Sequence, residues 1–398
     1  MTFIIILILL IIVLWLAIDY TLGRKKHFSQ LERRTLPIRE SNFQIFTNGP
    51  ELFHDLFSEL KAAKQHIHIL FYIVKNDQFS QEFLSILKEK AKAGVEIRLL
   101  LDWVGSLKIS RKTIRDLKSA GVNFSFSQVP KLPFLFYSSQ VRNHRKITVI
   151  DGKIGYMGGF NIGNEYINKD PKLNPWRDYH LKMTGEGVHD LQRELLFDWR
   201  EAAKTDLLHN TAYFPNLSKG RIRHQIFPYE GFFLEETYSA LIRKAESSII
   251  IGSPYFIPSQ QLFNDLRNAL KRGITVTILV PFKSDHLLVK EASYIYFRRL
   301  IKEGAEVYEY MKGFYHAKVI IIDDCICDIG TANFDKRSLF LNNEINCYVF
   351  DKVFIGEVKA ILQKDIQDAK KMELSDLYNI GLWGKIKEMA AKLISHFL

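Results

Sequence analysis

Cysteine is scarce in this sequence, which has only Cys325, Cys327 and Cys347 among its 398 residues. An odd number of cysteines, two of which alternate in an apolar run, does not make a disulfide framework. No cysteines and histidines have the paired spacing of a structural zinc site. These absences exclude a disulfide-stapled secreted domain and a zinc module, and they predict buried, reduced thiols.

Acidic residues are outnumbered by basic ones, 44 against 55, so the net charge is +11 and the pI is about 9.3. Large-scale disorder is also excluded, because 47% hydrophobic and 25% charged residues are values of a globular protein. The positive field favours anionic partners. Nucleic acid, anionic lipid and phosphate esters all qualify, and composition does not choose between them.

A long apolar run occupies residues 3–18, FIIILILLIIVLWLAI. As a helix this run would extend about 24 Å, slightly less than the hydrocarbon core of a bilayer, and flanking residues can lengthen the span. No basic residue precedes the run and no small-x-small cleavage site follows it. The pattern therefore favours an uncleaved anchor at residues 1–24 over a signal peptide.

Basic residues follow the apolar run directly, at Arg24, Lys25, Lys26, Arg33 and Arg34. Positive charge at the end of a membrane span favours the cytoplasmic side. We therefore expect a single-pass protein of the cell membrane whose remaining chain lies in the cytoplasm, where cysteines stay reduced.

From about residue 40 helical and strand-like patterns alternate, and the same order returns later in the chain. The predicted helices are 51–65, 81–94, 236–248 and 262–273, and the strand-like segments that follow them are 66–74, 95–102, 249–258 and 274–281. The sequence therefore predicts an internal duplication of an α/β unit. We place the two copies at 40–205 and 222–380, separated by a polar, Pro-containing stretch.

One motif occurs in both copies. Residues 143–161 read NHRKITVIDGKIGYMGGFN and residues 315–333 read YHAKVIIIDDCICDIGTAN, so His-x-Lys-x4-Asp-x9-Asn is written twice, 172 residues apart. Residues two apart in a strand share a face, so each His points the same way as its Lys. A single His-x-Lys pair is weak evidence, but recurrence of four positions in two otherwise dissimilar halves indicates function.

Each copy offers an imidazole, an ammonium and an amide, which together suit a phosphoryl group. If the halves meet face to face, His144, Lys146 and Asn161 would surround one phosphate together with the second set, His316, Lys318 and Asn333. The lysines and asparagines would hold the non-bridging oxygens. One His can attack phosphorus while the other protonates the leaving oxygen, so no metal or cofactor is required.

These residues resemble the HxKxxxxD signature of the phospholipase D superfamily, in its two-motif form with GG/GT-x-N after each copy. The resemblance covers residues 40–398. It implies a pseudo-twofold α/β fold with a mixed sheet flanked by helices, and a covalent phosphohistidine intermediate. His144 would then be the nucleophile and His316 the general acid, later the base, although the sequence does not settle which His attacks first.

The resemblance also implies roles for four carboxylates. Asp151 and Asp323, in the motifs, would be structural supports of the catalytic groups rather than phosphate ligands. A further carboxylate is expected to fix the Nδ1 proton of each His and so keep Nε2 free. The matching residues are Glu344 in NNEIN and Asp178 in NPWRDYH, and a plain surface salt bridge between Asp178 and Arg177 is the alternative.

The segments GGFNIGNEY, WRD, GTANFDKRS and NNE are similar to those of bacterial cardiolipin synthases, in the short form with one anchor. This similarity implies transfer of a phosphatidyl group from one phosphatidylglycerol to another, giving cardiolipin and glycerol. Phosphatidylglycerol and anionic membrane lipids are the expected partners. Three alternatives stay open: a hydrolytic phospholipase D, a nuclease of the same superfamily, and a non-catalytic adaptor. The anchor argues against nucleic acid as a partner.

Three other features have two interpretations each. The apolar insert PKLPFLFY (130–137) is either a wall of the site that dips into the membrane or an ordinary packed loop. His180 either lines the pocket or is a core histidine. The C-terminal segment 382–398 carries a helical apolar face and suits either an interfacial helix or packing into the core. That face is formed by Ile386, Met389, Ala390, Leu393 and Phe397.

Overall fold

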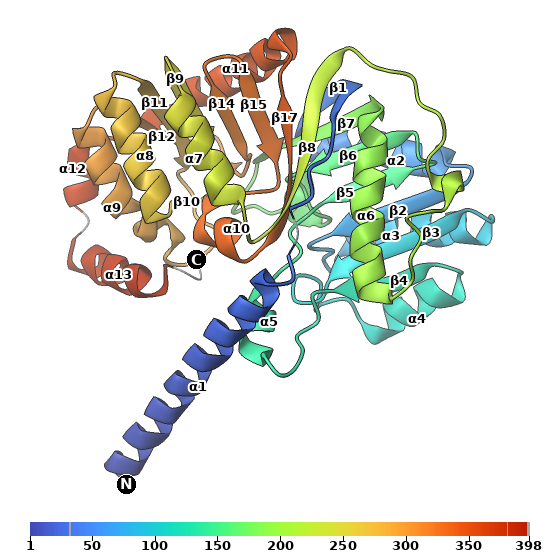
Figure 1. Cartoon of the computed structure of the whole chain (residues 1–398), viewed down its shortest axis with the longest axis horizontal. Coiled ribbons are helices and arrows are strands. Elements are labelled where there is room, and N and C mark those ends of the chain that lie inside the picture. Colours follow the sequence, from blue (N-terminus) through green and yellow to red (C-terminus); the bar gives the residue numbers. More distant parts are fainter. Residues whose placement is uncertain (32, 380, 396–398) are drawn as a thin grey trace.

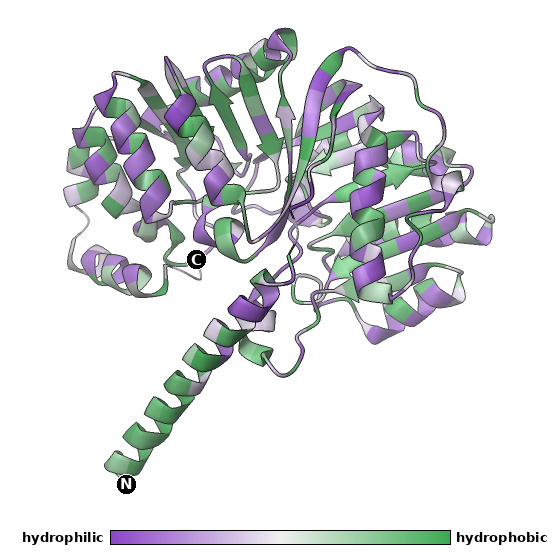
Figure 2. Ribbon diagram, viewed as in Figure 1, coloured by the Kyte–Doolittle hydropathy of each residue, from purple (hydrophilic) through white to green (hydrophobic). Residues whose placement is uncertain are grey.

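The computed structural model describes residues 1–31, 33–379 and 381–395, and the side chains of Leu382 and Leu393 are not described. Helix α1 (Thr2–Phe28) projects from the body of the protein (Figure 1). It is apolar along most of its length (Figure 2). Among the described residues it is the one helix long and apolar enough to cross a membrane, and it is longer than the predicted run because it continues through the basic residues.

The first copy of the duplicated unit follows α1. Its elements are β1 (Ile38–Asn48), α2 (Gly49–Ala62), β2 (His66–Phe71), α3 (Gln78–Lys92), β3 (Glu96–Asp102), α4 (Arg111–Ser119), β4 (Asn123–Ser127), α5 (Leu135–Gln140), β5 (Ile147–Ile150), β6 (Ile154–Gly158), η1 (Asn164–Ile167), β7 (Trp176–Gly185), α6 (Gly187–Ala203) and η2 (Thr211–Tyr213).

The second copy begins at β8. Its elements are β8 (Ile222–Glu230), α7 (Leu234–Lys244), β9 (Ser248–Gly252), β10 (Phe256–Ile257), α8 (Gln260–Lys271), β11 (Thr275–Pro281), α9 (Val289–Lys302), β12 (Glu306–Tyr310), β13 (Phe314–Tyr315), β14 (Val319–Ile322), β15 (Ile326–Gly330), β16 (Phe334–Asp335), α10 (Lys336–Phe340), β17 (Asn343–Val349), α11 (Lys352–Gln367), β18 (Ala369–Lys371), α12 (Leu374–Tyr378) and α13 (Gly381–Ile394).

Both copies contribute to one mixed sheet, whose order is β18-β12-β11-β9-β14-β15-β17-β8-β1-β7-β6-β5-β2-β3-β4. The order reads almost the same outward in both directions from the antiparallel β1–β8 pair. In each copy the inner strands are antiparallel and the outer strands parallel, for example β2–β3 and β11–β12, except that the edge strand β18 is antiparallel to β12. The predicted mixed, duplicated α/β fold is confirmed. The domain limits 40–205 and 222–380 stay a prediction.

Helices cover both faces of this sheet (Figure 1). Helix α2 illustrates why they form: Asn48 caps its N-terminus, and Leu52, Leu56 and Leu60, spaced four apart, are fully or almost fully buried. α2 and α3 pack on the first copy, and α7, α8 and α9 on the second. On the other face α6 and α11 share one apolar cluster with strands of both copies, which joins the halves.

A buried arginine also joins the halves. Arg145, between the motif His and Lys of the first copy, is fully buried. Its guanidinium contacts Asp198 on α6 at 2.7 Å and donates to the carbonyls of Tyr229 and Glu344 in the second copy at 3.0 and 3.1 Å. Removing one of these partners would leave a buried charge without compensation, which strongly destabilises the folded state. Arg145 therefore fixes how the two copies meet.

The apolar insert packs against α1. Its last three residues begin α5, and the carboxylate of Asp19 on α1 accepts a hydrogen bond from the Tyr137 amide at 2.7 Å. The rings of Tyr20 and Tyr137 meet edge to face at 5.5 Å. Asp19 is buried in this contact. The tip of the insert stays exposed, with Leu132 79% accessible.

Helix α13 packs through its less apolar side. Glu388 pairs with Arg298 on α9 at 2.5 Å and Ala391 is fully buried. The expected apolar face points outward instead, with Met389 65% accessible. Trp383, near the start of the same helix, is 77% accessible. The prediction that this face packs into the core is therefore wrong for Ile386 and Met389. The other interpretation, that the helix lies at a membrane interface, stays a prediction. Phe397 lies outside the described residues, as does the Leu393 side chain.

The expectation of buried thiols is correct for two of the three cysteines. Cys327 and Cys347 are buried, whereas Cys325 is exposed. The reason is local: Cys325 lies in the turn between β14 and β15, outside the paired residues of both strands.

Candidate active site

Each motif is hydrogen-bonded to the opposite copy of the fold. The His144 amide donates to the Asn343 carbonyl at 2.9 Å, and the Asn343 amide donates to the Arg142 carbonyl at 2.8 Å. In the other motif β13 pairs with β7, and the His316 amide donates to the Arg177 carbonyl at 2.7 Å. Each motif histidine is thus anchored to the strand that carries a predicted carboxylate of the other copy.

Glu344 is the partner of His144. Its two carboxylate oxygens lie 3.1 and 2.9 Å from Nδ1 of His144, and the side chain is fully buried. Thr331 and Ser338 also donate to it, at 2.6 and 2.8 Å. Burial alone would raise the pKa of Glu344, but the charges of His144 and Lys146 and these hydrogen bonds hold it below its ordinary value. Glu344 is therefore an anion at neutral pH.

Asp178 serves His316 in the same way. Its Oδ2 lies 2.6 Å from Nδ1 of His316, and its Oδ1 accepts from the Tyr179 amide at 2.8 Å. Burial opposes ionisation, but Lys318 and His316 hold the pKa of Asp178 below its ordinary value. The alternative salt bridge is wrong, because Arg177 pairs with Asp365 at 2.8 Å.

The sequence placed one carboxylate in each copy, and the structure pairs them crosswise. A carboxylate accepts only, so Nδ1 of each His carries the proton and Nε2 keeps its lone pair. Burial lowers the pKa of His144, and it lowers that of His316 to about 4. Both rings are therefore neutral near pH 7, with Nε2 available as a nucleophile or base.

The two lysines share this buried region. Lys146 is fully buried and donates to the His144 carbonyl at 2.6 Å. Lys318 lies 3.5 Å from Asp178 and also contacts the ring and carbonyl of His316. Burial lowers the pKa of Lys146 to about 7, and the charges of Lys318, Asp178 and Glu344 act on it as well. Groups from both copies therefore adjoin in one site.

Asp151 and Asp323 lie at the other ends of the motif strands. Asp151 accepts from the amides of Lys64, Gln65 and His66 at 2.7 to 2.9 Å. Asp323 accepts from the equivalent amides of residues 246–248 at 2.7 to 2.8 Å. The intervening strand β5 or β14 spans roughly 13 Å. These contacts are those of a structural support that fixes one strand against the next.

The two motif asparagines hold backbone and side chains. Asn161 accepts from the Ile73 amide at 3.1 Å and donates to Tyr166 at 3.2 Å. Asn333 donates to Asp335 at 3.1 Å, and its Oδ1 has no hydrogen-bond partner among the described residues. Their role as phosphate ligands stays a prediction.

Small residues after the first motif make room for the carboxylate. A Cβ at Gly159 would lie 2.0 Å from Oδ1 of Asp178, so only glycine fits there. At the equivalent position of the second copy stands Thr331, whose hydroxyl donates to Glu344. His180 is buried on the strand beside Gly158, and burial lowers its pKa to about 3. It is a neutral histidine next to the site.

Aromatic rings border both histidines, and the sequence interpretation missed them. Tyr72 lies 5.0 Å from the His144 ring, and Trp176 and Phe314 lie 4.8 and 5.7 Å from His316, measured between ring centroids. Trp176 comes two residues before Asp178 and Phe314 two residues before His316, but their facing arrangement depends on the cross-copy pairing of β7 and β13. No pattern within one copy predicts that pairing.

Comparison with known proteins agrees with the site. The family described as "Cardiolipin synthase, PLD-like domain" matches twice, at residues 56–174 and 238–366. The chain is 40% identical to minor cardiolipin synthase ClsB of Bacillus subtilis over 396 residues, which covers 99% of each protein. It is 36% identical to major cardiolipin synthase ClsA of the same organism over 368 residues, which covers 90% of this chain and 76% of that protein.

Among solved structures, phosphatidylserine synthase of Haemophilus influenzae superposes with a TM-score of 0.73 at 15% identity. The match covers 95% of this chain and 100% of that one, and it supports the fold. With two matches of one family, relatives of similar length and a paired His-carboxylate site, the chain belongs to the cardiolipin synthases, the phosphatidyltransferases of the phospholipase D superfamily.

Proposed function

We propose that this protein transfers a phosphatidyl group from one phosphatidylglycerol to a second, through a covalent intermediate on His144. The observation that carries the proposal is the crosswise pairing of each motif His with a buried carboxylate of the other copy. This arrangement gives two neutral imidazoles with free Nε2 atoms, one for each of the two roles that the reaction needs.

In the first step Nε2 of His144 attacks phosphorus, and the bond from phosphorus to the glycerol oxygen breaks. That oxygen takes a proton from His316, and glycerol leaves. Burial lowers the pKa of His316 to about 4, and the negative charge of an incoming phosphodiester raises it. Asp178 stabilises the resulting imidazolium.

In the second step a hydroxyl of another phosphatidylglycerol gives its proton to His316, and its oxygen attacks phosphorus. The bond from phosphorus to Nε2 of His144 breaks, and cardiolipin is released. Lys146 and Lys318 hold the non-bridging oxygens throughout, and the phosphate restores their charge by raising pKa values that burial has lowered.

Product analysis tests the proposal. Purified protein given phosphatidylglycerol with a labelled phosphate is expected to give cardiolipin and glycerol in equal amounts, because the intermediate is resolved by lipid rather than by water. The control is the His144→Ala protein. Phosphatidic acid as the sole product would contradict the synthase assignment and favour a hydrolytic phospholipase D.

We also propose that α1 spans the membrane and that the catalytic region lies on its cytoplasmic side, next to an anionic lipid surface. The apolar helix and the basic residues after it support this orientation. Protease added to inside-out vesicles is then expected to degrade the catalytic region, whereas intact spheroplasts protect it. Cleavage in intact spheroplasts would reverse the orientation.

A further inference from the structure

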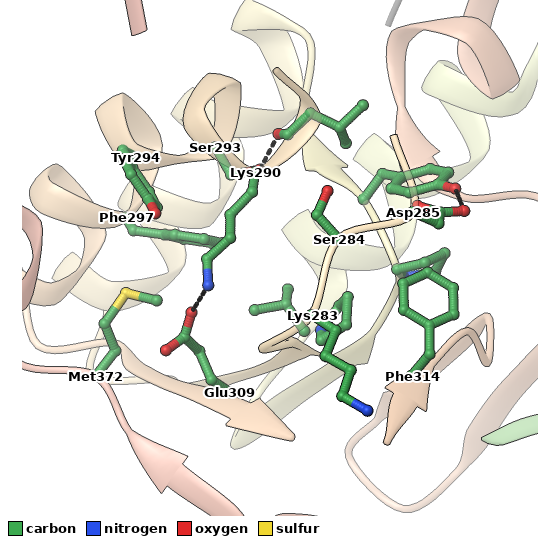
Figure 3. Close-up of a pocket in the computed structure, with 15 residues that line it drawn as sticks. Lys283, Ser284, Asp285, Lys290, Ser293, Tyr294, Phe297, Glu309, Phe314 and Met372 are labelled. Atoms are coloured by element: carbon green, nitrogen blue, oxygen red, sulfur yellow. Dashed lines mark hydrogen bonds and ion pairs between the residues drawn. The ribbon is translucent and has the colours of Figure 1, made fainter. Parts of the chain in front are cut away.

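A pocket next to the site plays no part in the mechanism above. It is a narrow pocket under the loop 282–288, between β11 and α9, with room for one small polar group. Figure 3 shows Asp285 and Phe314 at one end and Lys290 and Glu309 at the other. Lys290 and Glu309 form an ion pair at 2.8 Å and close that far end.

The Asp285 end of the pocket borders His316. Phe314, a lining residue, lies 5.7 Å from the His316 ring, and Tyr255, another, lies 6.2 Å from it. Lys283 reaches from the same loop to the Asn174 carbonyl of the first copy at 3.3 Å. The pocket is therefore separated by only the Phe314 and Tyr255 rings from the histidine that gives a proton to the leaving alcohol and takes one from the entering alcohol.

Asp285 has an unused acceptor. Its Oδ2 accepts from the Tyr255 hydroxyl at 2.6 Å, and His286 lies 3.5 Å from the same oxygen. Its Oδ1 is buried and has no hydrogen-bond partner among the residues that the structure describes. A buried acceptor without a partner costs free energy, which a ligand that donates a hydrogen bond would recover.

We propose that this pocket binds the free hydroxyl of the glycerol headgroup, with Oδ1 of Asp285 as its acceptor. The inference rests on the proposed function and names the residue that selects the alcohol. Since the reacting oxygen must lie at His316, the rest of the headgroup extends into the adjoining pocket. A carboxylate there repels a phosphate and suits a neutral polyol. Asp285 is thus a specificity residue for alcohols that carry a second hydroxyl.

The test compares two alcohols as acceptors. With phosphatidylglycerol labelled in its headgroup glycerol as donor, release of labelled glycerol measures the exchange. The Asp285→Asn protein is expected to need about 10-fold more unlabelled glycerol for half-maximal exchange, because a hydrogen bond to a charged group is lost. Transfer to 1-propanol, which has no second hydroxyl, is expected to stay at the wild-type level. Asp324→Asn, the same change at an exposed carboxylate that pairs with Lys359, should alter neither reaction.

Cardiolipin synthesis by the same variant shows whether the acceptor lipid, as well as free glycerol, uses this pocket. Cardiolipin synthesis by Asp285→Asn should fall together with glycerol exchange if the acceptor lipid uses this pocket, and unchanged synthesis would overturn the assignment. Equal loss with glycerol and propanol would also overturn it, because Asp285 would then act on His316 and Lys318 rather than on the alcohol. A wild-type protein that makes no cardiolipin from phosphatidylglycerol would instead refute the proposed function.

Discussion

Replacing His144 with alanine is expected to lower phosphatidyl transfer by about four orders of magnitude or more, because the atom that forms the covalent intermediate is gone. His316→Ala is expected to lower it by about 10²- to 10⁴-fold, as for loss of a general acid and base. Both rings are buried among groups of the other copy. Circular dichroism and thermal unfolding would show that each variant is folded.

An activated substrate separates the two roles. A phosphatidyl ester of p-nitrophenol has a leaving group that departs without a proton. The His316→Ala protein is therefore expected to release nitrophenol in a burst of about one equivalent, whereas the His144→Ala protein releases none. A burst from His144→Ala and none from His316→Ala would exchange the two assignments.

The second large effect is expected for the carboxylates. Glu344→Gln and Asp178→Asn should each lower transfer by about 10²- to 10⁴-fold, as for loss of the carboxylate behind a catalytic histidine. An amide can donate to Nδ1, which moves the proton to Nε2 and blocks its lone pair. Asp328→Asn is a matched control, because this buried acid contacts Tyr238 and Asn346, and burial already raises its pKa to about 7.

Because the pairing is crosswise, each carboxylate variant should resemble the histidine variant of the other copy. Glu344 lies in the second copy, yet Glu344→Gln should behave like His144→Ala and give no burst with the nitrophenyl ester. Asp178→Asn lies in the first copy, yet it should behave like His316→Ala and retain the burst. The opposite pattern would mean that each carboxylate serves the histidine of its own copy, against the contacts described here.

Local patterns predicted much of the fold. The strand predicted at 95–102 is β3 at Glu96–Asp102, and the helix predicted at 262–273 is α8 at Gln260–Lys271. Both are decided by periodicity and by end signals within about fifteen residues, such as the Ser259 cap of α8. The repeated motif likewise located the histidines and lysines, because duplication wrote the same local signal twice.

Contacts between the copies could not be predicted from such patterns. Glu344 and His144 are 200 residues apart, and their meeting depends on how β17 and the first motif pair across the junction. The burial of Arg145 also depends on contacts across this junction, and the contact of Asp19 with the insert joins two segments more than 100 residues apart. Each is a tertiary contact that no pattern within either segment specifies.

Locating the covalent phosphatidyl group tests the proposed intermediate on His144. Wild-type protein mixed with labelled phosphatidylglycerol and quenched within milliseconds at alkaline pH would be digested, and the labelled peptide identified by mass spectrometry. The proposed intermediate predicts label on His144, which should disappear when excess phosphatidylglycerol is added before the quench. Label on His316, or cardiolipin formed while no histidine ever carries label, would contradict it.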